Sequence, residues 1–126
     1  MTLTLPYPPS VNHLHTVARG RKIKSLRARQ YANEVHWRIA DELRVEADAW
    51  LPCKTDRLYI IIVAHAPDKR RRDLDNLLKG CLDSVCTALG VDDSQIDQLT
   101  ICRGHVDRGN PHVRVRLGLM PTEAVA

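Results

Sequence analysis

Two carboxylates and a lysine stand close together in the stretch RRRDLDNLLK, residues 70–79. Asp73 and Asp75 are two residues apart, and Lys79 follows four residues after Asp75. Mg²⁺ is usually held by one or two carboxylates, while water and phosphate oxygens fill its other positions. A lysine beside such an ion offsets negative charge on a reacting phosphate. The stretch is therefore a candidate for metal-assisted hydrolysis of a phosphodiester.

The two acids can serve one site only if Asp73 lies outside the helix that follows it. Residues two apart on an ideal helix point about 200° away from each other. The apolar helical pattern begins at Leu74, so Asp73 is expected at the N-cap, where its side chain is free of the helix register. In the alternative interpretation Asp73 caps the helix, Asp75 complements its dipole and Lys79 is half of a surface ion pair. Spacing alone leaves both interpretations open.

A third group of acids follows the same predicted helix, in GVDDSQID at residues 90–97. Asp92 and Asp93 are adjacent there, and Asp97 comes shortly after. If this loop folds back across a sheet towards the start of the helix, it completes a carboxylate cage for a hard divalent cation.

The cations of the chain gather in two clusters. One is the run before Asp73, and the other extends from Arg19 to Arg29 with no acid in it. With a net charge of +4, this clustering favours a polyanionic partner, although two solvated surfaces remain the structural alternative. Aromatic residues make up only 4%, which argues against base stacking as the main grip and favours contacts with a DNA backbone. The candidate DNA-binding residues are Arg19, Arg21, Lys22, Lys24, Arg70, Arg71 and Arg72.

Other functional classes lack their signatures in this chain. No Walker-type glycine loop, GxSxG elbow or HExxH pair is present. No apolar run approaches the ~20 residues that cross a bilayer, and the first ten residues do not resemble a secretion signal. We therefore expect a cytoplasmic protein that does not enter a membrane.

The periodicity predicts one α+β domain over residues 1–126, with two main helices packed on a mixed sheet. A short strand opens the chain, an exposed loop covers residues 11–24, and the first helix runs from Ser25 to about Ala47. Leu58–Ala66 is predicted as a central strand buried on both faces. The second helix ends at Gly90, a typical C-cap. Two strands, 98–106 and 112–119, are predicted to form a hairpin around DRGNP.

The segments LPYPPSVN near the start, RRRDLDNLLK and DDSQI resemble the RusA family of Holliday junction resolvases, the crossover junction endodeoxyribonucleases. The resemblance covers nearly the whole chain. It implies a RusA-like homodimer that binds four-way DNA junctions and cuts two opposing strands with Mg²⁺, for which Mn²⁺ is a possible substitute. The alternatives are a noncatalytic protein that binds branched DNA, and a nuclease that acts on other branched DNA.

The resemblance also implies a role for each residue of the motif. Asp73, Asp75 and Asp93 correspond to the metal-binding catalytic acids, with Asp92 as the alternative for the third. Lys79 corresponds to the essential lysine, and Arg72 to the functional arginine before the first acid.

Overall fold

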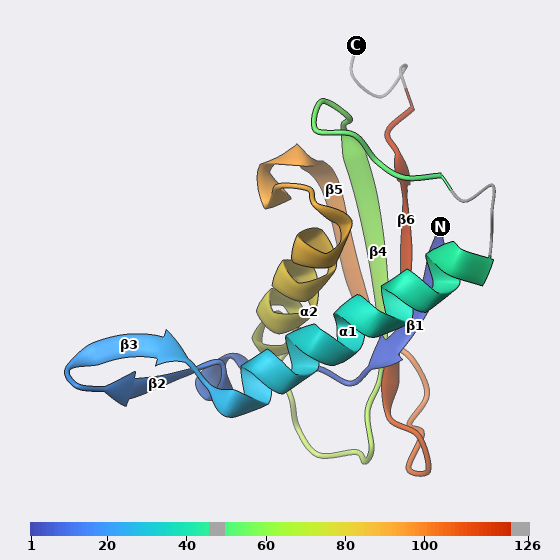
Figure 1. Ribbon diagram of the computed structural model, residues 1–126. Coiled ribbons are helices and arrows are strands. Elements are labelled where there is room, and N and C mark those ends of the chain that lie inside the picture. Colours follow the sequence, from blue (N-terminus) through green and yellow to red (C-terminus); the bar gives the residue numbers. More distant parts are fainter. Residues whose placement is uncertain (46–49, 122–126) are drawn as a thin grey trace.

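Four strands form one mixed sheet in the computed structural model, which describes residues 1–45 and 50–121. The strand order is β1-β6-β4-β5. β4 pairs in parallel with β5 and antiparallel with β6, which pairs antiparallel with β1 (Figure 1). The bounds of the strands are Thr2–Pro6 for β1, Leu58–His65 for β4, Ile96–Arg103 for β5 and His112–Leu119 for β6.

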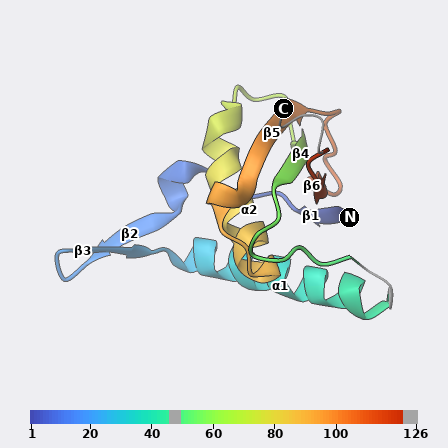
Figure 2. The same cartoon turned by 90° about the horizontal axis from the view of Figure 1, so that it is seen from above.

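Two helices lie on one face of this sheet, α1 over Leu26–Val45 and α2 over Leu74–Leu89 (Figure 2). The apolar stripe of α2 meets the sheet and α1 in a single core, which confirms the predicted α+β fold of one domain. Gly90 ends α2 at φ 71°, in the left-handed region that a C-cap glycine adopts, as predicted. The core side chains of the helices are Tyr31, Val35, Ile39, Leu77, Cys81 and Val85.

Within residues 1–45 and 50–121, no helix covers the other face of the sheet. On β4 the side chains alternate between buried and half-buried, so Tyr59, Ile61 and Val63 are only partly covered. The neighbouring β6 presents Arg114 and Arg116 on that face, both exposed. The prediction that β4 is buried on both faces is therefore wrong, because an unbroken apolar run does not reveal how many layers cover a strand.

The predicted hairpin around DRGNP is also wrong. β5 and β6 follow each other in the chain, yet β4 lies between them in the sheet. The connection from residue 104 to residue 111 therefore passes over the end of β4 rather than reversing between neighbours. The strand before it is shifted as well, since β5 ends at Arg103 and not at residue 106.

Residues 11–24 contain regular structure where an exposed loop was predicted. A short 3₁₀ helix, η1 (Val11–His13), is followed by strands β2 (His15–Ala18) and β3 (Arg21–Lys24), which pair antiparallel. Arg19 and Gly20 form the turn with φ of 53° and 75°, the combination of a type I′ hairpin. All eight strand residues are exposed, and the hairpin projects from the body of the protein (Figures 1 and 2).

The first helix begins one residue later than predicted, and Val45 is its last described residue. Ala47, which was predicted to lie in it, falls outside the described residues. After α2 a second short 3₁₀ helix, η2 (Asp93–Gln95), leads directly into β5. Within the described residues, neither α-helix has the length and apolar character needed to cross a membrane.

Candidate active site

An open groove of about 730 Å³ lies at the N-terminal end of α2. The chain after β1 forms one side, the loop after β4 forms the other, and the first turn of α2 lies between them. Asp73 and Asn76 line the groove beside several arginines. The remaining lining residues are Tyr7, Pro8, Pro9, Ser10, His13, Arg27, Pro67, Arg70, Arg71, Arg72 and Leu77.

The LPYPPS segment reaches this groove because it docks on α2 at a glycine. A Cβ atom on Gly80 would lie 3.1 Å from Leu14 Cδ2 and 3.4 Å from the Pro9 carbonyl oxygen, so the segment approaches the helix closely there. At the other end, the Tyr31 hydroxyl donates a 2.8 Å hydrogen bond to the Pro6 carbonyl. The N-terminal motif therefore builds one wall of the candidate site.

Asp73 occupies the N-cap position of α2, outside the helix register as predicted. Its backbone is extended, and its carboxylate makes none of the side-chain hydrogen bonds that a capping aspartate normally accepts. The alternative interpretation, in which Asp73 serves as a side-chain cap, is therefore not supported. Asp75 is exposed on the first turn of the same helix. Both carboxylates remain available to an external ligand.

Lys79 does not pair with Asp75 in this structure. Its Nζ lies 3.3 Å from Asp83 Oδ2, one turn further along α2, and both side chains are about half exposed. An exposed pair of this kind contributes little to stability, about 0–1 kcal/mol. The ammonium group of Lys79 can therefore leave Asp83 for a phosphate at small cost.

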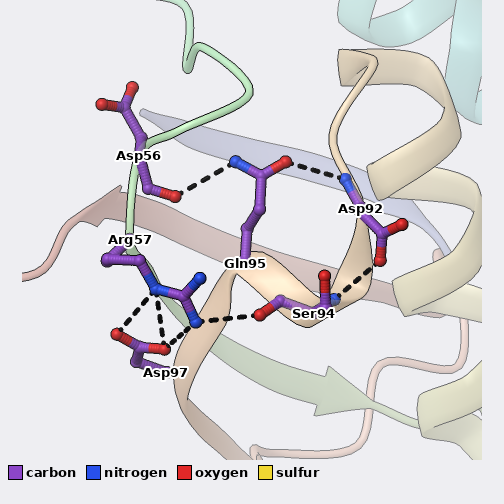
Figure 3. A network of polar contacts seen from close by, with 6 residues as sticks. All are labelled: Asp56, Arg57, Asp92, Ser94, Gln95 and Asp97. Atoms are coloured by element: carbon purple, nitrogen blue, oxygen red, sulfur yellow. Dashed lines mark hydrogen bonds and ion pairs between the residues drawn. The ribbon is translucent and has the colours of Figure 1, made fainter.

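Two of the acids after α2, Asp92 and Asp97, are held by neighbouring groups (Figure 3). The Asp92 carboxylate accepts the Ser94 backbone N–H at 2.9 Å, which lowers the pKa of Asp92. The Arg57 guanidinium donates a hydrogen bond to the Asp97 carboxylate, and this contact lowers the pKa of Asp97. Within residues 1–45 and 50–121, no cation or backbone N–H holds the carboxylate of Asp93. Of the two adjacent acids, Asp93 is therefore the one whose carboxylate is bound by no backbone N–H among the described residues.

Asp93 nevertheless lies far from Asp73 within one chain. Asp73 precedes α2 and Asp93 follows it, so the length of a 16-residue helix separates them. At 1.5 Å per residue this length is about 24 Å. No group of three or more potential metal-binding acids, histidines or cysteines occurs among the described residues. The expected folding of the acidic loop back to the start of α2 does not take place within a single chain.

The loop between β4 and α2 contains an acid that sequence reasoning missed. Asp68 accepts the Arg70 backbone N–H at 2.9 Å and lies 2.7 Å from Arg72 Nη1. These contacts, chiefly the hydrogen bond from Arg72, lower the pKa of Asp68 to about 2. Arg103, at the end of β5, donates to the Arg72 carbonyl and was missed too. In the sequence, Asp68 is a single acid before four cations. Neither Asp68 nor Arg103 belongs to a periodic pattern that would predict its role.

The second predicted set of DNA-binding residues lies apart from the groove, on the hairpin. The register pairs Val17 with Lys22 and His15 with Lys24, so these four side chains share one face. Arg21 is on the opposite face and Arg19 is in the turn. The structure thus brings Arg70, Arg71 and Arg72 beside Asp73 but holds the hairpin cations on a separate arm.

Comparison with known proteins gives a consistent result. Residues 6–118 match the family model described as Endodeoxyribonuclease RusA. A crossover junction endodeoxyribonuclease of Enterobacteria phage HK97 is 37% identical over 120 residues, which cover 94% of this chain and 91% of the relative. The Escherichia coli strain K12 protein of the same name is 35% identical over 123 residues, covering 97% and 93%. That of Enterobacteria phage 82 is 35% identical over 122 residues, covering 96% and 92%. The chain therefore belongs to the RusA family of endodeoxyribonucleases.

Proposed function

We propose that this protein is an endonuclease that resolves four-way DNA junctions by hydrolysing phosphodiester bonds in two opposing strands. The observation that carries the proposal is the uncapped carboxylate of Asp73 in a groove lined by arginines. Such a groove would hold the anionic backbone beside Asp73, whose carboxylate makes no cap hydrogen bond with α2. Relatives named crossover junction endodeoxyribonucleases, similar over nearly their whole length, support the choice of substrate.

The acids at the start of α2 suit a magnesium ion, with manganese as a substitute. Asp73 and Asp75 supply the one or two carboxylates that Mg²⁺ usually takes from a protein. A bound ion would supply an activated water and offset the charge that develops on the phosphate. We assign Asp93 as the third acid of the site. Lys79, which lies on α2 after Asp75, would offset the negative charge of the phosphate.

A homodimer would bring Asp93 of one chain close to Asp73 and Asp75 of the other chain. If two copies pack with their α2 helices antiparallel about a two-fold axis, the start of one α2 lies beside the end of the other. Apolar surface is present for such a contact: Leu78 and Leu82 on α2 are only partly buried, and Leu99 on β5 is 42% exposed. Two active sites then arise, one for each strand that is cut.

Mixing two inactive variants tests this arrangement. In a dimer that combines Asp75→Asn and Asp93→Asn chains, one composite site contains both substitutions and the other contains neither. The mixture is therefore expected to regain single-strand nicking of a junction that neither variant nicks alone. A mixture that stays inactive, although mixed dimers have been purified through a different affinity tag on each variant, would place all three acids of a site in one chain.

The DNA contacts are assigned to the two cationic surfaces. Arg70 and Arg71, which are exposed beside the groove, would hold the phosphates next to the scissile bond. The hairpin, with Lys22 and Lys24 on one face, would reach along a duplex arm, since a two-stranded ribbon fits the major groove. Acting on bacterial or phage DNA, the protein is expected in the cytoplasm.

A panel of substrates separates this function from its rivals. Four-way junctions, flaps, forks and linear duplexes of one sequence are incubated with the protein and Mg²⁺, and the cut strands are resolved on a denaturing gel. Junction resolution predicts symmetric cuts on the four-way junction above all other substrates. Equal or faster cutting of flaps or forks would indicate a nuclease for other branched DNA, and binding without cutting would indicate a noncatalytic protein.

A further inference from the structure

A second cavity adjoins the groove at the start of α2. Its volume is about 390 Å³, and small-molecule pockets in proteins typically have volumes of about 300–1,000 Å³. Arg70, Arg71, Arg72 and Asp73 line both the groove and this cavity. A molecule that enters the cavity therefore lies next to any phosphate held at Asp73.

Small residues at the end of the sheet leave this space open. Ala64, Ala66 and Gly104 line it, where larger side chains would fill it. The Gly104 N–H donates to the Ala64 carbonyl at 2.9 Å, and the Asp107 N–H donates to the Ala66 carbonyl at 2.9 Å. Leu74, on the first turn of α2, also lines the cavity and is only half-buried. Backbone hydrogen bonds therefore hold one wall to β4, and the apolar side chain of Leu74 remains accessible in another.

The lining of the cavity combines apolar residues with charged ones. Ala64 and Leu77 belong to the hydrophobic core, and the half-buried Val106 lines the cavity with them. The charged lining residues include Arg103 and the three arginines shared with the groove. Burying a phosphate against core residues is costly, because a charge loses its hydration there unless it is paired. A nucleotide therefore fits best with its phosphate among the arginines and its uncharged base against the apolar residues.

Tyr7 presents an aromatic ring to both spaces. It lines the groove and the cavity, and the Pro6 carbonyl before it accepts a 2.8 Å hydrogen bond from the Tyr31 hydroxyl. Burial raises the pKa of Tyr7, so its phenol is neutral at the pH of a nuclease assay. Proteins bind unstacked bases on aromatic rings and on guanidinium planes, and Arg103 also lines the cavity. The cavity thus offers both kinds of surface to a base.

We propose, building on the nuclease function proposed above, that this cavity is a base pocket, which receives one nucleobase adjoining the scissile phosphate. The base would leave the helical stack and bind among Tyr7, Ala66 and Leu74 while its phosphate remains beside Asp73. Extrusion of a base costs least where its pairing or stacking is already weakened. A four-way junction interrupts stacking at the point of strand exchange, so the pocket would favour a junction over a linear duplex.

The fluorescence of 2-aminopurine tests whether a base leaves the stack, because this base fluoresces more strongly when it is unstacked. It is placed on either side of the scissile phosphate, which wild-type cleavage locates. The Asp75→Asn protein is used so that the bound junction is not cut. We expect a several-fold rise in fluorescence at one of the two positions and none further along the same arm. A bound junction with no rise at either position would overturn the proposal.

Filling the pocket tests whether the base enters this cavity. In the Asp75→Asn background, Ala66→Phe should abolish the rise in fluorescence. Alone, Ala66→Phe should weaken the Kd for the junction by about 5- to 150-fold, the loss expected for one base–aromatic contact. A junction with an abasic nucleotide at the responding position has no base to bind. Wild type and Ala66→Phe should therefore have equal Kd values for the abasic junction.

Val45→Phe is the matched control for an added ring. It places the same ring in a cavity of about 400 Å³ between β1 and α1, at the opposite end of α1 from the groove. This variant should bind both junctions as the wild type does. Because a phenyl ring can disturb packing, Tm is measured for each variant, and Ala66→Leu repeats the comparison with a smaller side chain.

Equal weakening of the intact and the abasic junction by both Ala66 variants would overturn the proposal. Junction cutting by the wild type without any base extrusion would overturn the base pocket alone. Failure of the wild-type protein to cut any four-way junction would instead refute the proposed function itself.

Discussion

The Gln95 side-chain oxygen accepts the Asp92 backbone N–H across 3.0 Å, while the Asp92 carboxylate caps the turn that contains Gln95. The same Gln95 amide donates to the carbonyl oxygens of Cys53 at 2.9 Å and Asp56 at 3.1 Å. This capping box occupies Asp92 and ties the start of η2 to the chain before β4. It leaves Asp93, the next residue, as the acid that can face a ligand.

Replacing each of these neighbouring acids should therefore give opposite results. Asp92→Ala removes a cap and is expected to lower the free energy of unfolding by about 1 kcal/mol while junction cleavage is retained. Asp93→Asn is expected to abolish cleavage while stability is unchanged. Urea denaturation and a junction assay on both variants make the comparison. Loss of cleavage in Asp92→Ala with normal activity in Asp93→Asn would reverse the assignment.

Lys79→Ala should lower junction cleavage without affecting stability. Its partner Asp83 forms an exposed ion pair worth about 0–1 kcal/mol at most, so loss of the pair does not unfold α2. Removing a group that stabilises charge in the transition state typically costs about 10²–10³-fold in rate. Single-turnover cleavage measures this loss, and Asp83→Asn, which breaks the same ion pair, is the control. Unchanged turnover in Lys79→Ala would remove the lysine from the mechanism.

The hairpin cations should contribute to affinity but not to chemistry. For Lys22→Ala or Lys24→Ala, the slope of log K against log salt is expected to fall by about 1, the contribution of one phosphate contact. At saturating protein the cleavage rate should match the wild type, because the hairpin lies apart from the groove. Lys54→Ala, an exposed lysine before β4, is the control. A lysine variant of the hairpin with the wild-type slope would show that the arm does not contact the backbone.

Gly104 is required by a close approach of a buried ring. A Cβ atom at this position would lie 2.2 Å from the ring of His65, which is 4% exposed and bonded through Nδ1 to the His105 carbonyl at 2.8 Å. Gly104→Ala is therefore expected to lower the free energy of unfolding by about 1–3 kcal/mol. Nothing lies within 4 Å of a Cβ at Gly109, so Gly109→Ala is the matched control. Equal stability of the two variants in chemical denaturation would contradict this account.

The parts of the fold that were predictable depend on local patterns. The apolar stripe from Leu74 to Leu89 and the glycine after it predict α2 and both of its ends. Burial of one helix face requires apolar residues at helical spacing, and a left-handed C-cap favours glycine, so both features can be recognised in the sequence. The N-cap position of Asp73 follows from the same pattern. These features needed no knowledge of distant residues.

The parts that were not predictable depend on partners elsewhere in the chain. DRGNP signals a turn but does not show that β4 separates β5 from β6. The hairpin at residues 15–24 buries neither face, so its strands lack the apolar alternation that would reveal them. Asp68 has a role only because Arg72 folds back onto it, which composition does not indicate.

The proposed resolution of junctions is best tested by strand cleavage of a synthetic four-way junction, beside a linear duplex of the same sequence. Wild type and Asp75→Asn are each assayed with Mg²⁺ and with EDTA. We expect paired nicks in opposing strands of the junction, formed only by the wild type and only with the metal. Tight junction binding without any cut in Mg²⁺ or Mn²⁺, or nicks that persist in Asp75→Asn, would contradict it.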